Sequence, residues 1–541
     1  MAHPDLAREQ AYVDHAHACL DRMRSTVERA AGAVDNEVAG LAMEAWARRR
    51  LATFSDAEQG LCFGRLDLDE SARPLYVGRR WVHDEERQVV VCNWQAPAAR
   101  PFYTATPVEP QRVRLRRRFR TKGRQIVDIA DEALDGSALE GAAVSDFLLE
   151  ELDRGREGRM RDIVATIQAD QYRLITAEPE GALVVQGGPG TGKTAVGLHR
   201  ASWLLFTRHG ELRRRGVLVV GPNPLFMEYV SHVLPALGEE AVEQRAVSEL
   251  VDGIEPRRED TAEVARLKAD PRLAEVVRRA VEFAVRPAPA ELVLYVDGAY
   301  VKVRERDVAA LVEELLEAGL PLARAKERLR IELVRRFYRD YGERLGGAAY
   351  RSAEEIERAL RRQGFLGRFL DRVLPVPKAD ALVRRLLSSR ETLAAAADGI
   401  LDPDEQALLL KERPRGGFAP HDLPLLDEAR ALVDGPPPRF GHVIVDEAQD
   451  LTPLQLRMVA RRSAAGALTV LGDVAQATGP VLYASWDELA PYLGAELRVE
   501  ELRHAYRVPA EIMDLALPLL ARIAPDVEPP IAYRTGGDPP R

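Results

Sequence analysis

The chain has 541 residues, enough for several domains, and 76 basic against 85 acidic side chains give it a formal net charge of −9. A protein that lives on bare nucleic acid is usually basic, because phosphate neutralisation supplies most of its affinity, so the composition argues against that class. No apolar run is long enough to span a bilayer and no export signal is visible, so we expect a soluble cytoplasmic protein without a membrane partner. The three cysteines form no close pair, so we expect neither a zinc site nor a disulfide framework.

Residues 1–60 are predicted to be helical. Apolar residues recur every three or four positions from Ala16 to Val34, with charged residues between them. This spacing is typical of a long amphipathic helix or a helical hairpin. Such a helix either packs on its own domain or projects as an arm into a partner.

Residues 61–125 are predicted to form a small antiparallel sheet, because short β-branched runs alternate there with turn-rich pieces. The region ends in a dense basic run, "RVRLRRRFRTKGR", from Arg112 to Arg124. Three interpretations remain open for this run. It grips nucleic-acid phosphates, it is an exposed strand face, or it complements acidic patches of this same chain.

A helical connector is predicted over 126–165, followed by an α/β core with a parallel sheet in two parts, 166–244 and 435–498. The segment between them, 245–434, is charged and helical in pattern, and it is too long to be a loop. We therefore expect a large helical insertion. The remaining residues, 499–541, are predicted to begin a further domain.

The stretch "GGPGTGKT" fits the pattern G-x-x-x-x-G-K-[ST] between an apolar strand and an apolar-periodic helix. Glycines let successive backbone N–H groups point at phosphates. Lys193 is expected to reach the β- and γ-phosphates, and Thr194 to place its hydroxyl on Mg²⁺. The predicted triphosphate-binding residues are Gly187, Gly188, Pro189, Gly190, Thr191, Gly192, Lys193 and Thr194.

A second motif, "HVIVDEAQD", places Asp446 and Glu447 at the end of an apolar strand. In a parallel sheet such an end lies beside the phosphate loop. We predict that Asp446 holds Mg²⁺ and that Glu447 polarises the attacking water.

Three weaker signals complete the candidate site. Gln476, after the strand in "LTVLGDVAQAT", is predicted to bond the γ-phosphate. Tyr506 and Arg507 are predicted to stack on the base and to stabilise charge on the γ-phosphoryl group. Gln171 precedes the loop strand and is predicted to read the adenine edge through its amide.

Together, Gln171 and the motifs "GGPGTGKT", "DEAQDLTPLQ", "GDVAQ" and "AYR" resemble superfamily 1 motor ATPases of the UvrD/Rep type. The resemblance implies ATP and Mg²⁺ bound between two RecA-like domains. It implies these roles: Gln171 and Tyr506 at the base, Lys193 and Thr194 at the phosphates, Asp446 on the metal, Glu447 as general base, and Gln476 and Arg507 as sensors of the γ-phosphate.

Other segments, among them "YVGRRWVHD" and "VVCNWQAPAARPFY", resemble the HelD-type RNA-polymerase-recycling ATPases. That resemblance implies binding to RNA polymerase through an N-terminal helical arm and the insertion in the first motor domain, and ATP-driven release of stalled polymerase. Some members displace rifamycins from polymerase. DNA would be a secondary partner.

Two departures from the helicase pattern keep alternatives open. Val481 stands where helicases carry a tryptophan that stacks on single-stranded DNA, while Tyr483 and Trp486 lie further on, which predicts weak tracking along a strand. The chain ends at Arg541, soon after Arg507, so we expect an incomplete second RecA-like domain and impaired turnover. The alternatives are a UvrD-like 3′–5′ DNA helicase and a non-catalytic polymerase-binding fragment.

Overall fold

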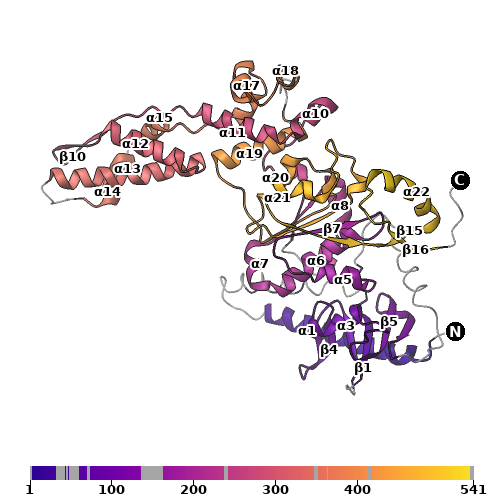
Figure 1. The fold of residues 1–541 in the computed structure, drawn as a ribbon. Helices are drawn as coiled ribbons and strands as arrows, with labels where there is room; N and C mark the ends of the chain where they lie inside the picture. The colour runs from indigo at the N-terminus through magenta and orange to yellow at the C-terminus, as the bar shows by residue number, and fades with distance from the viewer. Residues whose placement is uncertain are drawn as a thin grey trace.

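The computed structural model describes residues 3–31, 60–69, 73–135, 163–236, 242–345, 351–361, 364–411 and 417–535, together with Met43, Ala47 and Leu51. It is an α/β protein in which a small β domain lies beneath a central parallel sheet, and a helical insertion covers the sheet's other side and projects from it (Figure 1). Most of the predicted 126–165 connector, and the predicted helix beyond residue 31, lie outside the described residues.

The N-terminal domain is a six-stranded sheet with the order β3-β4-β2-β1-β5-β6. Its neighbouring strands are antiparallel except β2 and β4, which are parallel. Its elements are α1 (Leu6–Ala31), β1 (Cys62–Leu68), β2 (Leu75–Gly78), β3 (Val82–His83), β4 (Val89–Asn93), η2 (Pro97–Ala99), α3 (Arg100–Thr104), β5 (Val113–Lys122) and β6 (Gln125–Ala133).

Helix α1 lays its apolar stripe on one face of this sheet. Val13, Ala16 and Leu20 are buried there in one cluster with residues of β1, β2, β4 and β6. Tyr12 stacks on Tyr76 of β2, with ring centroids 3.6 Å apart. The stripe therefore packs on its own domain, and the prediction of a projecting arm is wrong for residues 6–31, because the sheet already covers the apolar face.

The basic run forms β5, and several of its arginines form ion pairs within the chain. In the β5–β6 hairpin, Arg116 lies opposite Glu132 and Arg117 opposite Asp131, and each pair is joined by an ion pair of 2.6 Å. Arg117 also pairs with Glu9 of α1 at 2.6 Å. Of the three interpretations, complementing acidic patches of this chain is therefore the one that holds for these arginines.

The same hairpin corrects the predicted boundary between residues 125 and 126. Residues 125–133 are strand β6, so the sheet continues where a helical connector was predicted to begin. Its acidic residues Asp128, Asp131 and Glu132 lie opposite Arg120, Arg117 and Arg116 of β5, and these cross-strand pairs stabilise an extended strand rather than a helix.

The central sheet has six strands in the order β14-β7-β13-β12-β8-β9, and every neighbouring pair is parallel. The strands are β7 (Ala182–Gly187), β8 (Val217–Gly221), β9 (Val242–Ala246), β12 (His442–Val445), β13 (Leu468–Gly472) and β14 (Leu497–Leu502). Strand β14 pairs with β7, so the predicted core boundary at residue 498 is wrong, and the core extends to Leu502.

The two faces of this sheet pack against different parts of the chain. Val185 and Val219 belong to a cluster with α6 and the N-terminal domain. Val184 and Val220, one position earlier or later on the same strands, belong to a cluster with helices of the insertion. The core helices are α5 (Ala169–Ile175), α6 (Lys193–Thr207), α7 (His209–Arg215), α8 (Pro224–Val230), α9 (Val233–Ala236), α20 (Pro453–Ala460) and α21 (Ala490–Leu493).

The insertion is helical as predicted but has two parts (Figure 1). Its base packs on the sheet through α10 (Ala262–Ala269), α11 (Arg272–Ala284), α16 (Ala379–Leu386), α17 (Arg390–Ala397), α18 (Pro403–Lys411) and α19 (Leu423–Val433). Its arm projects away and has its own core, built from β10 (Leu292–Val296), β11 (Ala299–Val303), α12 (Glu305–Glu317), α13 (Leu322–Arg344), α14 (Ala353–Arg361) and α15 (Phe365–Val373).

After β14 the chain forms a parallel strand pair, β15 (His504–Pro509) and β16 (Ile531–Arg534), joined by α22 (Ala510–Ile523). This unit lies beside the edge of the central sheet that carries β7 and β14 (Figure 1). Among the described residues, no helix combines the length and the apolar character needed to cross a membrane.

Candidate functional site

The loop Gly187–Thr194 connects β7 to α6, and its conformation depends on glycine. Gly190 and Gly192 have φ angles of 76° and 88°, in the left-handed region that other residues rarely adopt. Gly192 is the N-cap of α6, so the N-terminus of a buried 15-residue helix opens into the loop. Backbone N–H groups at a helix N-terminus favour anions, which gives the loop the chemistry of a phosphate site.

Lys193 and Thr194, the last two residues of the loop, begin α6 and contact different partners. The Lys193 ammonium donates to the carbonyl oxygen of Gly187 at 2.6 Å. The Thr194 hydroxyl lies close to the carboxylate of Asp446 at the end of β12 and lowers the pKa of that carboxylate. The structure therefore brings the predicted Mg²⁺ ligands together, although 252 positions of sequence separate them.

Asp446 is a buried carboxylate. Burial raises its pKa to about 6, and the negative charge of Glu447 acts in the same direction, while the Thr194 hydrogen bond and the Lys193 charge oppose the shift. A nearby cation would offset the cost of holding the ionised form in this position.

Glu447 occupies an unusual backbone position directly after Asp446. Its φ angle of 52° lies in the left-handed region, which costs a non-glycine residue about 1–2 kcal/mol. Its N–H donates to the Asp446 carboxylate at 2.9 Å, and its own carboxylate accepts from the Gln449 amide at 2.8 Å. Strained backbone of this kind persists only where surrounding contacts enforce it, and it occurs often at functional sites.

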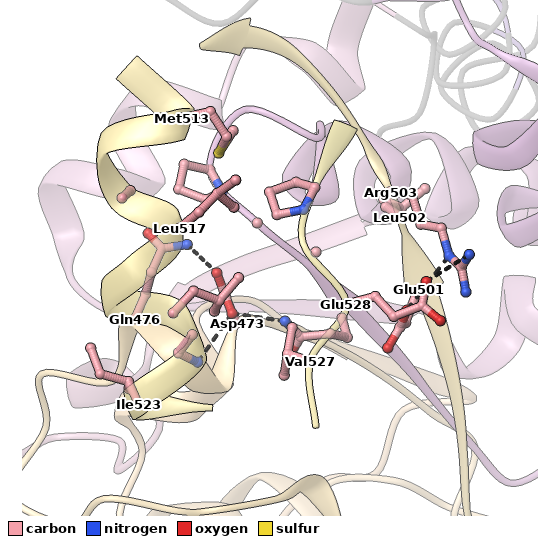
Figure 2. Close-up of a pocket in the computed structure, with 18 of the residues that line it drawn as sticks. Asp473, Gln476, Glu501, Leu502, Arg503, Met513, Leu517, Ile523, Val527 and Glu528 are labelled. Atoms are coloured by element: carbon pink, nitrogen blue, oxygen red, sulfur yellow. Dashed lines mark hydrogen bonds and ion pairs between the residues drawn. The ribbon is translucent and has the colours of Figure 1, made fainter. Parts of the chain in front are cut away.

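Gln476 lies at the end of the neighbouring strand β13, in the short helix η8 (Val474–Gln476). Its exposed amide donates to Asp473 at 2.5 Å, as Figure 2 shows. Both residues border a cavity of about 170 Å³ that is also lined by Gly187, Gly188 and Pro189 of the loop. On the other side the cavity is closed by apolar residues of α22, with Met513, Leu517 and Ile523 labelled in Figure 2.

Tyr506 and Arg507 lie against the loop through strand β15. The Tyr506 N–H donates to the Gly190 carbonyl at 3.0 Å, and the Tyr506 ring is buried beside Tyr533. A side chain at Gly190 would come within 3.0 Å of the Arg507 Cβ, so glycine permits this close approach. The Arg507 side chain is exposed.

Gln171 is buried and contacts the loop from α5. Its amide N–H donates to the Thr191 carbonyl at 3.0 Å, and its amide oxygen accepts the Gln168 N–H at 3.1 Å. In this arrangement the amide holds the loop. Its contact with an adenine edge stays a prediction.

The N-terminal domain contacts the helix that carries Gln171. Tyr103 of α3 stacks on Tyr172 of α5, and its hydroxyl donates to the Val164 carbonyl at 3.1 Å. Gln95 donates to Ser202 of α6 at 2.8 Å. Two elements that flank the loop are thus tied to the small β domain.

Two residues of the site were not predicted from the sequence. Gln186, the residue before the loop, bonds Asp473 and Trp486. Its position directly before Gly187 was the available signal. Trp486 gave no signal of this kind, because it is far from Gln186 in sequence and meets it only when the parallel sheet has formed.

Comparisons with known proteins identify one region. Residues 6–144 match the family model described as DNA helicase IV HelD, N-terminal domain. This range contains α1 and the whole six-stranded sheet. The search of curated proteins found no match. The chain therefore carries an N-terminal domain of the HelD type and is a HelD-like protein.

Proposed function

We propose that this chain is an ATP-binding, HelD-like motor that binds RNA polymerase and uses ATP to release or recycle stalled polymerase. The proximity of the Thr194 hydroxyl to the buried Asp446 carboxylate carries the proposal, since it joins a phosphate-type loop to a carboxylate at a strand end. The HelD-type N-terminal domain supports the choice of partner.

The donor set fits Mg²⁺ and a triphosphate. Mg²⁺ prefers hard oxygen ligands, and the Thr194 hydroxyl with the Asp446 carboxylate supplies two. The loop N–H groups and the α6 N-terminus would receive phosphate oxygens, and Lys193 would exchange the Gly187 carbonyl for one of them. When bound, Mg²⁺ would neutralise charge on the phosphates.

Three further side chains have the chemistry for hydrolysis. Glu447, held by Gln449, would orient water toward the γ-phosphate. Gln476 would exchange Asp473 for a γ-phosphate oxygen. The exposed Arg507, whose Cβ lies next to Gly190, would direct its guanidinium to the charge that develops on the γ-phosphate. Tyr506 would contact the base, but only 6% of this residue is exposed, so its ring would have to become accessible before a base could stack on it.

Charge and shape support RNA polymerase, rather than nucleic acid, as the main partner. The net charge is −9, and Arg116, Arg117 and Arg120 of β5 form ion pairs with acidic residues of β6. The insertion provides a projecting helical arm (Figure 1), on which Tyr295 and Tyr300 are exposed. DNA remains a secondary partner in this proposal, and rifamycin displacement is its most specific extension.

The DNA helicase alternative is disfavoured by Trp486. Only 5% of this side chain is exposed, and its indole N–H donates to Gln186 at 2.8 Å. It offers no open face for a DNA base, and base stacking of that kind contributes about 1–3 kcal/mol per base. A tailed duplex that is unwound by the chain in an ATP-dependent manner would favour the alternative.

The proposal is tested with Lys193→Ala. We expect it to abolish binding of a fluorescent ATP analogue, whereas Lys302→Ala, a lysine of the projecting arm, leaves binding unchanged. Phosphate release is then measured with and without RNA polymerase. Release of polymerase from a stalled complex and displacement of rifamycin from polymerase are measured in parallel. Equal binding by both variants contradicts the loop assignment. A polymerase complex without phosphate release would select the non-catalytic alternative.

A further inference from the structure

We propose that Gln186 and Trp486 are positioning residues for the hydrolytic step. On this view, the Trp486 N–H locks the orientation of the Gln186 amide. Gln186 in turn holds Asp473, whose carboxylate contacts Gln476 and whose backbone N–H is linked to Glu447 through Gln449. This inference rests on the proposed ATPase function and names residues that the sequence motifs do not assign.

The first link is the contact between Trp486 and Gln186. Trp486 belongs to η9 (Trp486–Leu489), and its indole N–H donates to the Gln186 amide oxygen at 2.8 Å. The Val474 N–H donates to the same oxygen at 3.2 Å. An indole N–H can only donate, so both partners require the amide oxygen on this side. The opposite amide orientation would set two donors against an NH₂ group.

The second link follows from that fixed orientation. The Gln186 NH₂ group faces Asp473 and donates to its Oδ1 at 2.7 Å. Gln186 and Asp473 are each only 3% exposed, so water does not compete strongly for these groups. Buried hydrogen bonds of this kind hold their members in one arrangement.

Asp473 connects this pair to both candidate catalytic positions. Its Oδ2 accepts from the Gln476 amide at 2.5 Å, which Figure 2 shows at the edge of the cavity. Its backbone N–H donates to the Gln449 amide oxygen at 3.0 Å, and the Gln449 NH₂ group donates to Glu447 at 2.8 Å. One carboxylate residue thus links the proposed γ-phosphate sensor and the proposed general base.

Close packing leaves the network little freedom. A Cβ atom at Gly472 would lie 2.7 Å from the Trp486 ring and 2.4 Å from the Gln449 amide oxygen. Glycine at this position therefore lets the indole and the Gln449 amide approach the end of β13 together.

The test compares two conservative variants of one segment. Trp486→Phe keeps an aromatic ring but loses the N–H on Gln186. Tyr483→Phe also loses one buried hydrogen bond, to Leu451, without touching Gln186. Steady-state phosphate release gives kcat and KM, a fluorescent ATP analogue gives nucleotide Kd, and thermal unfolding gives the stability of each variant.

We expect Trp486→Phe to lower kcat about tenfold and to leave Kd within about twofold, while Tyr483→Phe changes neither by more than about twofold. Gln186→Ala should lower kcat at least as far. The double variant Gln186→Ala/Trp486→Phe should be no slower than Gln186→Ala alone, because both changes break one chain of contacts.

The inference is overturned if both phenylalanine variants lower kcat equally, if Trp486→Phe changes only Kd, or if the double variant shows fully multiplicative losses. Each of these results leaves the proposed ATPase function intact. A wild-type chain that releases no phosphate even with RNA polymerase overturns the proposed function, and this inference with it.

Discussion

The ring of Tyr103 stacks on the ring of Tyr172, with centroids 4.6 Å apart and planes inclined by 11°. Tyr103 belongs to the HelD-type N-terminal domain, and Tyr172 is the neighbour of Gln171, which holds the loop at Thr191. The stack therefore joins the domain that matches the HelD family model to the helix that supports the candidate nucleotide site.

Two substitutions of Tyr103 are expected to distinguish the contribution of its hydroxyl group from that of its ring. Tyr103→Phe loses the bond to the Val164 carbonyl and should cost about 1 kcal/mol of unfolding free energy. Tyr103→Ala also removes the buried ring and should cost about 3–5 kcal/mol and weaken nucleotide binding. Tyr300→Ala, on the exposed arm, is the control. Unfolding in urea and titration with a fluorescent ATP analogue measure both effects, and an unchanged nucleotide Kd in Tyr103→Ala would show that the stack does not support the loop.

Gln171→Glu is expected to weaken nucleotide binding about tenfold. The carboxylate can still accept the Gln168 N–H but can no longer donate to the Thr191 carbonyl, so one face of the loop loses its support. Gln168→Ala removes a side-chain bond to Thr166 without touching the loop and serves as the control. Comparable Kd values for the two variants would contradict a loop-holding role.

Lys268 at the base of the insertion is expected to be far more important for stability than an exposed basic residue nearby. Its buried ammonium lies 2.7 Å from Asp260 and 2.6 Å from Asp422, and both carboxylates are fully buried. Lys268→Met leaves two buried charges without this partner and should cost about 3–5 kcal/mol.

The control for this change is Arg272→Met, which breaks ion pairs with Asp270 and Glu405 on the surface. An exposed pair contributes about 0–1 kcal/mol, so this variant should unfold within a few degrees of the wild type. Thermal unfolding of the two variants gives the comparison. Equal unfolding midpoints for the two variants would show that the buried ion pairs of Lys268 contribute no more to stability than the surface ion pairs of Arg272.

His442 on β12 should make the central sheet sensitive to acid. Burial, assisted by the positive charge of Arg200, lowers its pKa to about 3, while an unfolded histidine titrates near 6.5. The unfolded state therefore binds more protons, so this contribution to stability is present above pH 6.5 and is lost as the pH falls toward 3.

Between pH 6.5 and pH 5 the loss should reach about 2 kcal/mol. His442→Gln keeps a group that can bond Thr469 but cannot titrate, so it should lack this loss. Hydrogen exchange of the β12 and β13 amides at pH 7, 6 and 5 measures it locally. Parallel pH curves for the wild type and the variant would contradict the assignment.

Much of the candidate site could be predicted because its requirements are local. The loop needs glycines at Gly190 and Gly192 for positive φ angles, and a strand and a helix on either side, all within one short stretch. The proximity of Thr194 to Asp446 followed from a rule of parallel sheets, in which strand ends meet at one edge. The network through Gln186 and Trp486 could not be predicted in this way, because it depends on which side-chain atoms face one another.

The sequence by itself determined that one face of the first helix is apolar and that Arg112–Arg124 is densely charged. It also determined that a glycine-rich loop precedes Lys193 and that two adjacent carboxylates, Asp446 and Glu447, follow an apolar strand. Tertiary structure alone decided what covers these surfaces. Hydrophobic burial has no direction, so the stripe of α1 specified burial but not the sheet that receives it. A charge pairs with whichever opposite charge the fold brings near. Arg116 and Arg117 of β5 therefore pair with Glu132 and Asp131 of β6 rather than with nucleic acid.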